Sequence, residues 1–500
     1  MSQPPPRSIV ILGGGTAGWM TANLLRQRWA DHGTRISLIE SSTIGIIGVG
    51  EGSTPQLKAF FDQLGIAEAE WMPRCNATYK AGIEFAGWSD KPGYERYFHP
   101  FPTDVDGFTQ TKFFYSTRAR RTGQDVPAHP DPFFLQTRIA RDGRAPIAPA
   151  NFPFAVGYGY HFDAHLIGAF LREFGTKRGI EHIDTRVVSV ELGEHGDVNA
   201  LVADDGRRFE ADLYVDASGF RATIIEGALK EPHRPFGENL FNDRAVVAPT
   251  ALPAEGIQAC TRSTAKSAGW IWHIPLTNRI GNGYVYSSRY IDRDGAAAEL
   301  REHLGLQEDS DVRHLEMRCG RIERSWVKNC LAVGLAQGFL EPLEATALHI
   351  VINTVETFLA SWDEERRAEF NAAIARRYEG IRDYLVCHYR TAQRSDTDYW
   401  RALTANDALS DSLKRVVTAW FTGSDLEEEV LRQDISKYYS PMSWHCMLAG
   451  YGNFPRDELL KPPSTNVPRV DLADVERFVS GCAVNFPLLT HALEHLEKAA

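Results

Sequence analysis

The stretch SIVILGGGTAGW, Ser8 to Trp19, decides the fold of this chain. Its first five residues are mostly β-branched or apolar and predict a buried strand, and the next six have the glycine spacing GxGxxG. Helical spacing of Ala, Leu and Met then continues to Trp29. A glycine loop between a strand and a helix lets the backbone approach a pyrophosphate, which the helix N-terminus binds. The segment therefore predicts a Rossmann-type nucleotide-binding unit.

A second predicted strand, Arg35 to Glu40, ends in a carboxylate about twenty residues after the glycine loop, where a dinucleotide site places an acid on ribose hydroxyls. NAD and FAD share this fingerprint, so other features must separate them. Two more strand-to-glycine turns occur at 213–221 (LYVDASGFR) and 330–338 (CLAVGLAQG), and no second GxGxxG is present for a nicotinamide nucleotide. Three distant turns feeding one site are typical of FAD-dependent aromatic hydroxylases.

Composition excludes several classes of protein. The net charge of −11 and the lack of a basic run argue against a nucleic-acid surface. Seven scattered cysteines without a CxxC pair fit a reducing compartment and neither a disulfide framework nor a metal site. No apolar run approaches the roughly twenty residues of a membrane helix. The N-terminal apolar strand leads into the glycine loop and not into a signal-cleavage pattern. We therefore expect a cytoplasmic protein that binds neither metal, membrane nor nucleic acid.

The segment GWIWHIPL, Gly269 to Leu276, has an unusual aromatic pattern. In an extended strand, alternation places Trp270, Trp272 and Ile274 on one face. Pro275 lacks an N–H and ends the ladder of hydrogen bonds. Taken alone, the pattern is typical of a half-buried edge strand that packs an aromatic stripe into a core.

Over nearly its whole length the chain resembles the flavin-dependent tryptophan-halogenase family. The matching motifs are GGGTAGW (13–19), GVGEGSTP (48–55), YKAGIEFAGW (79–88), DASGFR (216–221), GWIWHIPL (269–276) and GLAQGFLEPLEATAL (334–348). The resemblance implies an α/β, FAD-binding, flavin-monooxygenase-like fold with a Rossmann-type βαβ unit, a mixed sheet and a mainly helical C-terminal region. Residues 1–345 are expected to form the FAD domain, with substrate-binding segments at about 80–155 and 240–300, and residues 346–500 a helical cap.

The resemblance also implies the cofactor chemistry. Reduced FAD from a separate flavin reductase, together with O2 and chloride or bromide, yields hypohalous acid. The backbone N–H groups of Thr346 and Ala347 are implied to hold the halide. Trp270 and Trp272 are implied to form a wall beside the flavin that discourages ordinary monooxygenation. The implied FAD-binding residues are Gly13, Gly15, Thr16, Ala17, Gly18, Glu40, Gly50, Glu51, Asp216, Gly334 and Leu335.

Two residues carry the implied halogen transfer. Lys80 matches the family lysine, which either donates a hydrogen bond to hypohalous acid or becomes a haloamine. Glu344 matches the carboxylate that stabilises the cationic intermediate and accepts the proton lost by the ring. Glu341, three residues earlier, is the weaker candidate. The family usually has Glu-Ser-Thr-Gly where this chain has Glu344-Ala-Thr-Ala347, and the added Cβ at Ala347 can alter the pocket or the backbone.

The substrate is predicted to be a small aromatic molecule. The resemblance places an indole between His99 and Phe101 on one side and Tyr438 and Tyr439 on the other. Family members that bind free tryptophan have a tyrosine pair further upstream, whereas this chain has the acidic run 424–429, which would repel a carboxylate. We therefore expect indole or an indole derivative without a free amino-acid group.

Two other functions compete with halogenation. One is an FAD-dependent aromatic monooxygenase that hydroxylates the substrate directly; the segment 269–276 together with Lys80 and Glu344 argues against it. The other is a non-catalytic, FAD-binding redox or interaction protein that has kept the fold and lost turnover. A reductase that uses a nicotinamide nucleotide is disfavoured because no second nucleotide loop is visible.

Overall fold

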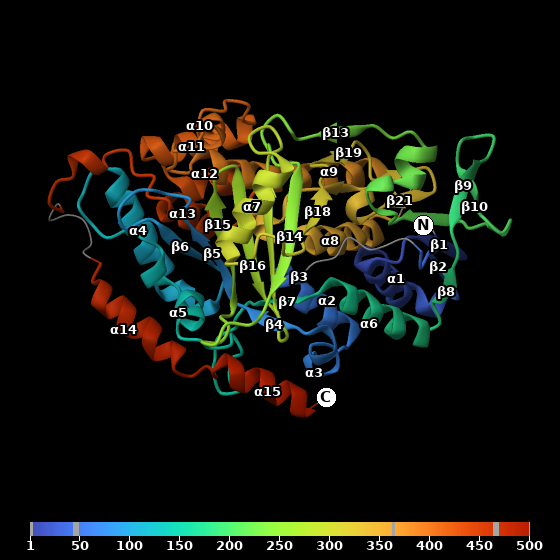
Figure 1. Cartoon of the computed structure of the whole chain (residues 1–500), viewed down its shortest axis with the longest axis horizontal. Coiled ribbons are helices and arrows are strands. Elements are labelled where there is room, and N and C mark those ends of the chain that lie inside the picture. Colours follow the sequence, from blue (N-terminus) through green and yellow to red (C-terminus); the bar gives the residue numbers. More distant parts are fainter. Residues whose placement is uncertain (1–3, 44–49, 363–365, 464–469, 500) are drawn as a thin grey trace.

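A computed structural model describes residues 4–43, 50–362, 366–463 and 470–499 (Figure 1). The first two residues of the motif at 48–55 lie outside these ranges. A parallel sheet surrounded by helices lies at one end of the molecule, a mixed sheet occupies the middle, and C-terminal helices gather at the other end (Figure 1).

The glycine loop begins in the centre of this sheet, whose order is β20-β21-β12-β1-β2-β8 and which is parallel except for the antiparallel pair of β20 and β21. β1 (Ser8–Leu12) pairs in parallel with β2 (Arg35–Glu40) and with β12 (Leu213–Asp216), and β12 pairs in parallel with β21 (Cys330–Ala332). Because β1, β12 and β21 are neighbours and parallel, their three glycine turns lie at the same edge of the sheet. The outer strands are β8 (Glu181–Asp184) and β20 (Trp326–Val327).

The mixed sheet has seven strands in the order β18-β14-β17-β16-β15-β5-β6. All neighbours are antiparallel except β15 and β5. The strands are β5 (Gly82–Ala86), β6 (Arg96–Pro100), β14 (Arg244–Thr250), β15 (Cys260–Lys266), β16 (Gly269–Pro275), β17 (Ile280–Tyr286) and β18 (Arg313–Glu316).

The tryptophan segment is β16, and its predicted alternation is confirmed. Trp270, Trp272 and Ile274 belong to the main hydrophobic core, while Ile271 packs on the opposite face with α7 (Arg293–Leu304). The edge position expected from the octapeptide alone is wrong, because β15 and β17 flank β16 on both sides. Apolar residues cover both faces of β16, so an interior place in the sheet suits it better than an edge.

A small antiparallel sheet links the nucleotide-binding end to the mixed sheet. It contains β3 (Gly50–Gly52), β7 (Gly159–Asp163) and β4 (Thr78–Lys80) in the order β3-β7-β4. A Cβ at Gly281 of β17 would lie 3.3 Å from the Cα of Gly50, so the backbones approach closely where β3 meets the mixed sheet. The surrounding helices are α1 (Thr16–Trp29), α2 (Gln56–Leu64), α3 (Glu68–Trp71) and α6 (Ala164–Lys177).

Helices form most of the chain after residue 346. α8 (Ala347–Ala360) contacts α1, and α10 to α13 gather beside β5, β6 and α4 (Gln110–Arg121), while α14 and α15 run back along the lower edge towards α3 (Figure 1). The C-terminal segment contains two helices, α14 and α15, with Pro487 between them. The bounds are α5 (Leu135–Arg141), α9 (Arg367–Arg390), α10 (Asp398–Thr404), α11 (Asp411–Thr422), α12 (Leu426–Arg432), α13 (Pro441–Gly450), α14 (Leu472–Ala483) and α15 (Leu489–Ala499).

These elements confirm the predicted α/β fold with a Rossmann-type unit, a mixed sheet and a mainly helical C-terminal region. The remaining strands are β9 (Val187–Leu192), β10 (Val198–Ala203), β11 (Arg208–Phe209), β13 (His233–Pro235), β19 (Gly320–Ile322) and β22 (Gly338–Phe339). All seven cysteines are free thiols. Within the described ranges, each helix is too short or too polar to cross a membrane.

Candidate active site

The three motif glycines of the loop differ in their surroundings: two are closely packed and one faces open space. A Cβ at Gly13, whose φ is +120°, would lie 2.2 Å from the carbonyl oxygen of Ala217, and a Cβ at Gly18 would lie 1.9 Å from that of Gly13. These two positions need glycine because strand and helix backbones approach each other there. A Cβ at Gly15 would meet nothing within 4 Å. The space in front of the α1 N-terminus is therefore free for a pyrophosphate.

Glu40 lies directly over this loop. A Cβ at Gly14 would fall 1.7 Å from Glu40 Oε2, so the absence of a side chain at Gly14 admits the carboxylate. Glu40 Oε1 lies 2.7 Å from His182 Nε2 and 3.4 Å from Arg172. Its position at the end of β2 is the one from which dinucleotide-binding folds bind ribose, so ribose binding by Glu40 stays a prediction.

The glycine turns that follow β12 and β21 lie at the same edge of the sheet as the glycine loop. Asp216 accepts hydrogen bonds from the backbone N–H groups of Ser218, Ile224 and Ile225, so its carboxylate fixes the turn that follows β12. Gly334 has a φ of +60°, and a Cβ there would lie 2.7 Å from the Cβ of Ala17 on α1. Leu335 follows Gly334 in the same turn, and the Thr16 hydroxyl at the start of α1 donates to the carbonyl of Ala164. Together these residues fit an FAD-type dinucleotide.

Glu51 is a half-buried carboxylate in the small sheet that also contains β4, the strand of Lys80. It lies in β3 between Gly50 and Gly52. Burial, with a smaller contribution from Asp163, raises the pKa of Glu51 to about 7. Its charge therefore changes near neutral pH, unlike that of an ordinary glutamate.

Lys80 is the last residue of β4, and its side chain is fully buried. Its Nζ has no hydrogen-bond partner among the described residues and lies 5.5 Å from the centre of the Phe101 ring. Burial lowers the pKa of Lys80 to about 8, although the neighbouring Glu344 and Cys260 oppose the change. A buried cation without a partner is costly and marks a functional group.

The opposite face of β4 holds this strand in place. The Tyr79 hydroxyl donates to Glu68 Oε2 over 2.7 Å, and the hydroxyls of Tyr158 and Tyr160 donate to the other oxygen of Glu68. Because successive residues of a strand point to opposite faces, anchoring Tyr79 fixes the direction of Lys80.

Glu344 closes a short 3-10 turn, Pro342–Glu344, and only 5% of it is exposed. Its Oε1 accepts hydrogen bonds from His388 Nε2 over 2.9 Å and from His99 Nδ1 over 3.3 Å. Burial alone would raise the pKa of Glu344, but these two imidazoles hold it at about 2. Glu344 is therefore ionised throughout the physiological pH range and able to accept a proton.

The second glutamate of the segment has a different environment. Glu341 Oε2 accepts hydrogen bonds from Asn242, Tyr389 and Trp270. Burial raises the pKa of Glu341, in contrast to Glu344. Glu341 thus fixes the first tryptophan of β16 in the core, and the preference for Glu344 as the base stays a prediction.

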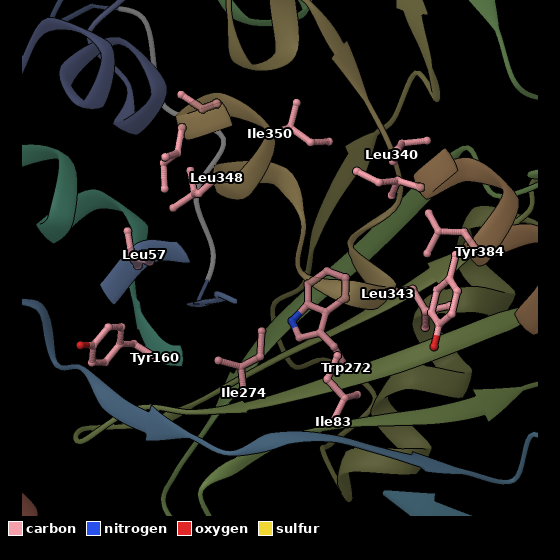
Figure 2. Close-up of a cluster of buried hydrophobic side chains, with 14 of the residues drawn as sticks. Leu57, Ile83, Tyr160, Trp272, Ile274, Leu340, Leu343, Leu348, Ile350 and Tyr384 are labelled. Atoms are coloured by element: carbon pink, nitrogen blue, oxygen red, sulfur yellow. The ribbon is translucent and has the colours of Figure 1, made fainter. Parts of the chain in front are cut away.

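Trp272 lies near the segment that carries Glu341 and Glu344. Its indole lies between Ile274 and Leu343, close to Ile83 (Figure 2). Its Nε1 is buried and finds no hydrogen-bond partner in the described part of the chain. Leu343 immediately precedes Glu344, so the Trp272 face of β16 packs next to the segment that carries the carboxylate (Figure 2).

The predicted halide residues begin α8. Thr346 is buried and precedes the first helical residue, Ala347. The first N–H groups of a helix lack intrahelical acceptors and favour an anion. Ala347 has helical backbone geometry and accepts a Cβ without strain. The left-handed conformation of this turn lies instead at Ala345, with a φ of +55°.

The predicted substrate residues are only partly brought together. His99 contacts Glu344, and Phe101 lies beside Lys80. Tyr439 stacks on Tyr384 of α9 with ring centres 3.5 Å apart, whereas Tyr438 packs against Arg377 and Gly380. The acidic run 424–429 forms the start of α12, where its carboxylates stabilise the helix N-terminus.

Sequence reasoning missed several residues of this site. They are His388, Tyr384 and Tyr451 next to Glu344, and His161 and Thr261 next to Lys80. The sequence did contain one signal for His388: it is a polar residue at helical spacing on the apolar, buried face of α9.

The fold and the site together define a flavin-dependent oxidoreductase with a buried lysine and an ionised carboxylate. Residues 8–462 match the family described as tryptophan halogenase. The tryptophan 6-halogenase SttH of Streptomyces toxytricini is 36% identical over 486 residues, 90% of each sequence. The tryptophan 7-halogenase RebH of Lentzea aerocolonigenes is 32% identical, covering 89% of this chain and 90% of RebH. The chain belongs to the flavin-dependent tryptophan halogenase family, a family of enzymes, as the motifs predicted.

Solved structures agree with this assignment. BrvH, a flavin-dependent halogenase from Brevundimonas sp. BAL3, superposes with a TM-score of 0.83 at 33% identity, covering 99% of this chain and 100% of BrvH. The structure of SttH superposes with the same TM-score at 32% identity, covering 100% of both chains.

Proposed function

We propose that this enzyme halogenates an electron-rich arene, with hypohalous acid held at Lys80 and the ring proton accepted by Glu344. The observation that carries the proposal is the fully buried Lys80 ammonium, which has no hydrogen-bond partner in the described residues and whose pKa responds to Glu344. A lysine in that setting is available for a reactant.

FAD, when bound in its reduced form, supplies with O2 the oxidising power that turns halide into hypohalous acid. The residues that would hold it are the glycine loop, Glu40 and the turns at Asp216 and Gly334, with Gly50 and Glu51 between them and Lys80. Thr346 and Ala347 would hold the halide, chloride or bromide, at the N-terminus of α8. A separate flavin reductase would supply the reduced flavin.

The protein groups have distinct roles in halogen transfer. The Lys80 ammonium donates a hydrogen bond to the oxygen of hypohalous acid and polarises its bond to the halogen. Glu344, ionised because His388 and His99 donate to it, stabilises the positive charge that develops on the ring. It then takes the proton that the ring must lose. The wall that contains Trp272 excludes water from this space.

The proposed substrate is indole or an indole derivative without a free amino-acid group. The aromatic side chains of Phe101, Tyr384 and Tyr439 suit a flat, apolar ring. The segment at 424–429, where the family members for free tryptophan carry a tyrosine pair, is here an acidic helix start that offers no attraction for a carboxylate. We also propose that residues 1–345 form the FAD domain and residues 346–500 the cap over the substrate.

A product assay tests this function. The enzyme, a flavin reductase, FAD and NADH are incubated with either indole or L-tryptophan, and with either chloride or bromide. Mass spectrometry is expected to find a halogenated indole formed faster than halogenated tryptophan. Hydroxylated products would support the monooxygenase alternative, and equal rates with free tryptophan would contradict the proposed substrate class.

A further inference from the structure

A buried chain of hydrogen bonds runs beside the catalytic lysine. The Thr78 hydroxyl donates to the carbonyl of Pro275 over 2.7 Å. His161 Nδ1 lies 3.0 Å from the same hydroxyl oxygen, and His161 Nε2 lies 2.9 Å from the hydroxyl of Thr261. Thr78 and His161 are fully buried and Thr261 nearly so. The chain therefore links the end of β16 to a hydroxyl next to Lys80.

The direction of each hydrogen bond in this series follows from the Pro275 carbonyl at its start. The Pro275 carbonyl can only accept, so the Thr78 proton is used there, and His161 Nδ1 must donate to the Thr78 oxygen. Burial, with a smaller effect of the Lys80 charge, keeps the pKa of His161 well below its usual value. His161 is therefore neutral, its Nε2 carries no proton, and Thr261 donates to it. The free lone pairs of Thr261 then face away from His161.

Gly52 lies beside both Thr261 and Lys80. A Cβ at Gly52 would lie 3.2 Å from Lys80 Nζ and 3.2 Å from Thr261 Oγ1. Both polar atoms therefore border the same place above a residue without a side chain. Lys80 Nζ nevertheless makes no hydrogen bond to any described residue, so Thr261 is not its partner in this arrangement. A donor and an acceptor that lie this close without bonding to each other suit a small molecule that can both accept and donate.

We propose that Thr261 is a second binding group for hypohalous acid, oriented by His161 and Thr78. This inference deepens the proposed function and rests on it. The oxygen of hypohalous acid accepts from the Lys80 ammonium, and its O–H donates to Thr261 Oγ1. The two contacts fix the oxygen and leave the halogen as the free end of the molecule. His161 and Thr78 act through Thr261 and are positioning residues.

The transfer balances in atoms and electrons. A π-electron pair of the arene forms the new carbon–halogen bond, and the oxygen–halogen bond breaks with its electron pair on oxygen. Lys80 gives that oxygen a proton, so water leaves, still donating to Thr261. Glu344 takes the proton from the ring, and a proton returned to Lys80 restores both groups. The arene and hypohalous acid thus become haloarene and water.

The variants Thr261→Val and Thr261→Ser test the proposal. Valine keeps the shape and removes the hydroxyl, whereas serine keeps the hydroxyl. With reductase, bromide and indole, the wild type and both variants are compared for bromoindole formed per O2 consumed, with methionine in bulk solution to trap escaped oxidant. Thr261→Val is expected to lower this ratio about tenfold while oxidant is still produced, and Thr261→Ser to remain close to the wild type. Thr78→Val is expected to lie between them.

Two further readouts separate a lost contact from general damage. Hypohalous acid bound to Thr261 would stabilise the charged Lys80 to which it also bonds, so Thr261→Val is expected to move the alkaline loss of bromination to lower pH. Glu344, Cys260 and His161 are the other titratable neighbours of Lys80. In flavin-free protein given stoichiometric hypobromite, the wild type directs more bromine into indole than Thr261→Val does. An unchanged ratio and pH profile in Thr261→Val, or a serine variant as impaired as the valine one, overturns the proposal. Failure of the proposed function shows instead in the wild type, as no halogenated product of reductase-driven turnover.

Discussion

His388 donates a hydrogen bond from Nε2 to Oε1 of Glu344 over 2.9 Å, and both side chains are buried. The other ring nitrogen of His388 lies 2.7 Å from the Tyr451 hydroxyl, which donates to it. Burial lowers the pKa of His388, so the ring is neutral and its tautomer is fixed by these two partners. The arrangement keeps a buried carboxylate ionised through its two imidazole partners, His99 and His388.

Replacing Glu344 by Gln removes the charge and keeps the shape. We expect halogenation of indole to fall by roughly 10²- to 10⁴-fold, because a positioned general base is lost. The oxidation of reduced flavin should continue, since the role proposed for Glu344 is confined to halogen transfer. Product formation and O2 consumption are measured together. Glu341→Gln is the matched control: its carboxylate supports Trp270, so it should lower thermal stability more than the ratio of product to O2.

Replacing His388 by Phe should make the enzyme sensitive to acid. The pKa of Glu344 is held at about 2 by His388 and His99, so the wild-type base stays charged as the pH falls to 5. Without His388, burial raises that pKa, and halogen transfer should fail at a higher pH. The pH profile of product formed per O2 checks this. His388→Gln retains an N–H donor and should lie closer to the wild type, whereas identical acid profiles for all three proteins would contradict the account.

The alkaline side of the profile reports on Lys80. Its pKa of about 8 makes it mainly an ammonium at pH 7 and mainly a neutral amine at pH 9. If the ammonium holds hypohalous acid, halogen transfer declines as the pH rises through about 8. A haloamine route needs the neutral amine and would show the opposite trend. Single-turnover measurements of haloindole, with flavin oxidation followed separately, distinguish the two.

Glu51 should make FAD binding dependent on pH. Its pKa of about 7 means that it gains negative charge between pH 6 and 8, close to the proposed site of an anionic cofactor. Oxidised FAD is therefore expected to bind the flavin-free protein more tightly at pH 6 than at pH 8. Quenching of flavin fluorescence measures the affinity. Glu51→Gln should remove most of the difference, and a pH dependence that persists in this variant would assign it to another group.

Gly283 makes room for the Trp272 indole. The two residues are partners across β16 and β17, and a Cβ at Gly283 would lie 2.2 Å from the Trp272 ring. Gly283→Ala should therefore displace the ring and lower the free energy of unfolding by about 1–3 kcal/mol. Denaturant unfolding followed by tryptophan fluorescence measures the loss. Gly107→Ala, where a Cβ meets nothing within 4 Å, is the control and should change stability little.

Sequence patterns predicted those parts of the fold and the site whose residues are close together along the chain. The glycine loop and Glu40 follow from a strand, a turn and a helix in order, and the face of Trp272 follows from the period of a strand. His388 lies 44 positions from Glu344, and Thr261 lies 181 positions from Lys80, so no local pattern predicts that they come close together. Their places depend on the packing of α9 against the mixed sheet and on the pairing of β15 with β5. The interior position of β16 has the same origin, because its neighbours are set by the whole sheet.

The most direct test of the central claim compares the wild type with Lys80→Met in one assay. Methionine keeps the length and burial of the side chain and removes the ammonium. With indole, bromide, FAD, a flavin reductase and O2, mass spectrometry measures bromoindole while an oxygen electrode measures flavin oxidation. The account predicts bromoindole from the wild type and, from Lys80→Met, continued O2 consumption with no more than trace product. Bromoindole formed by Lys80→Met at the wild-type rate would contradict it.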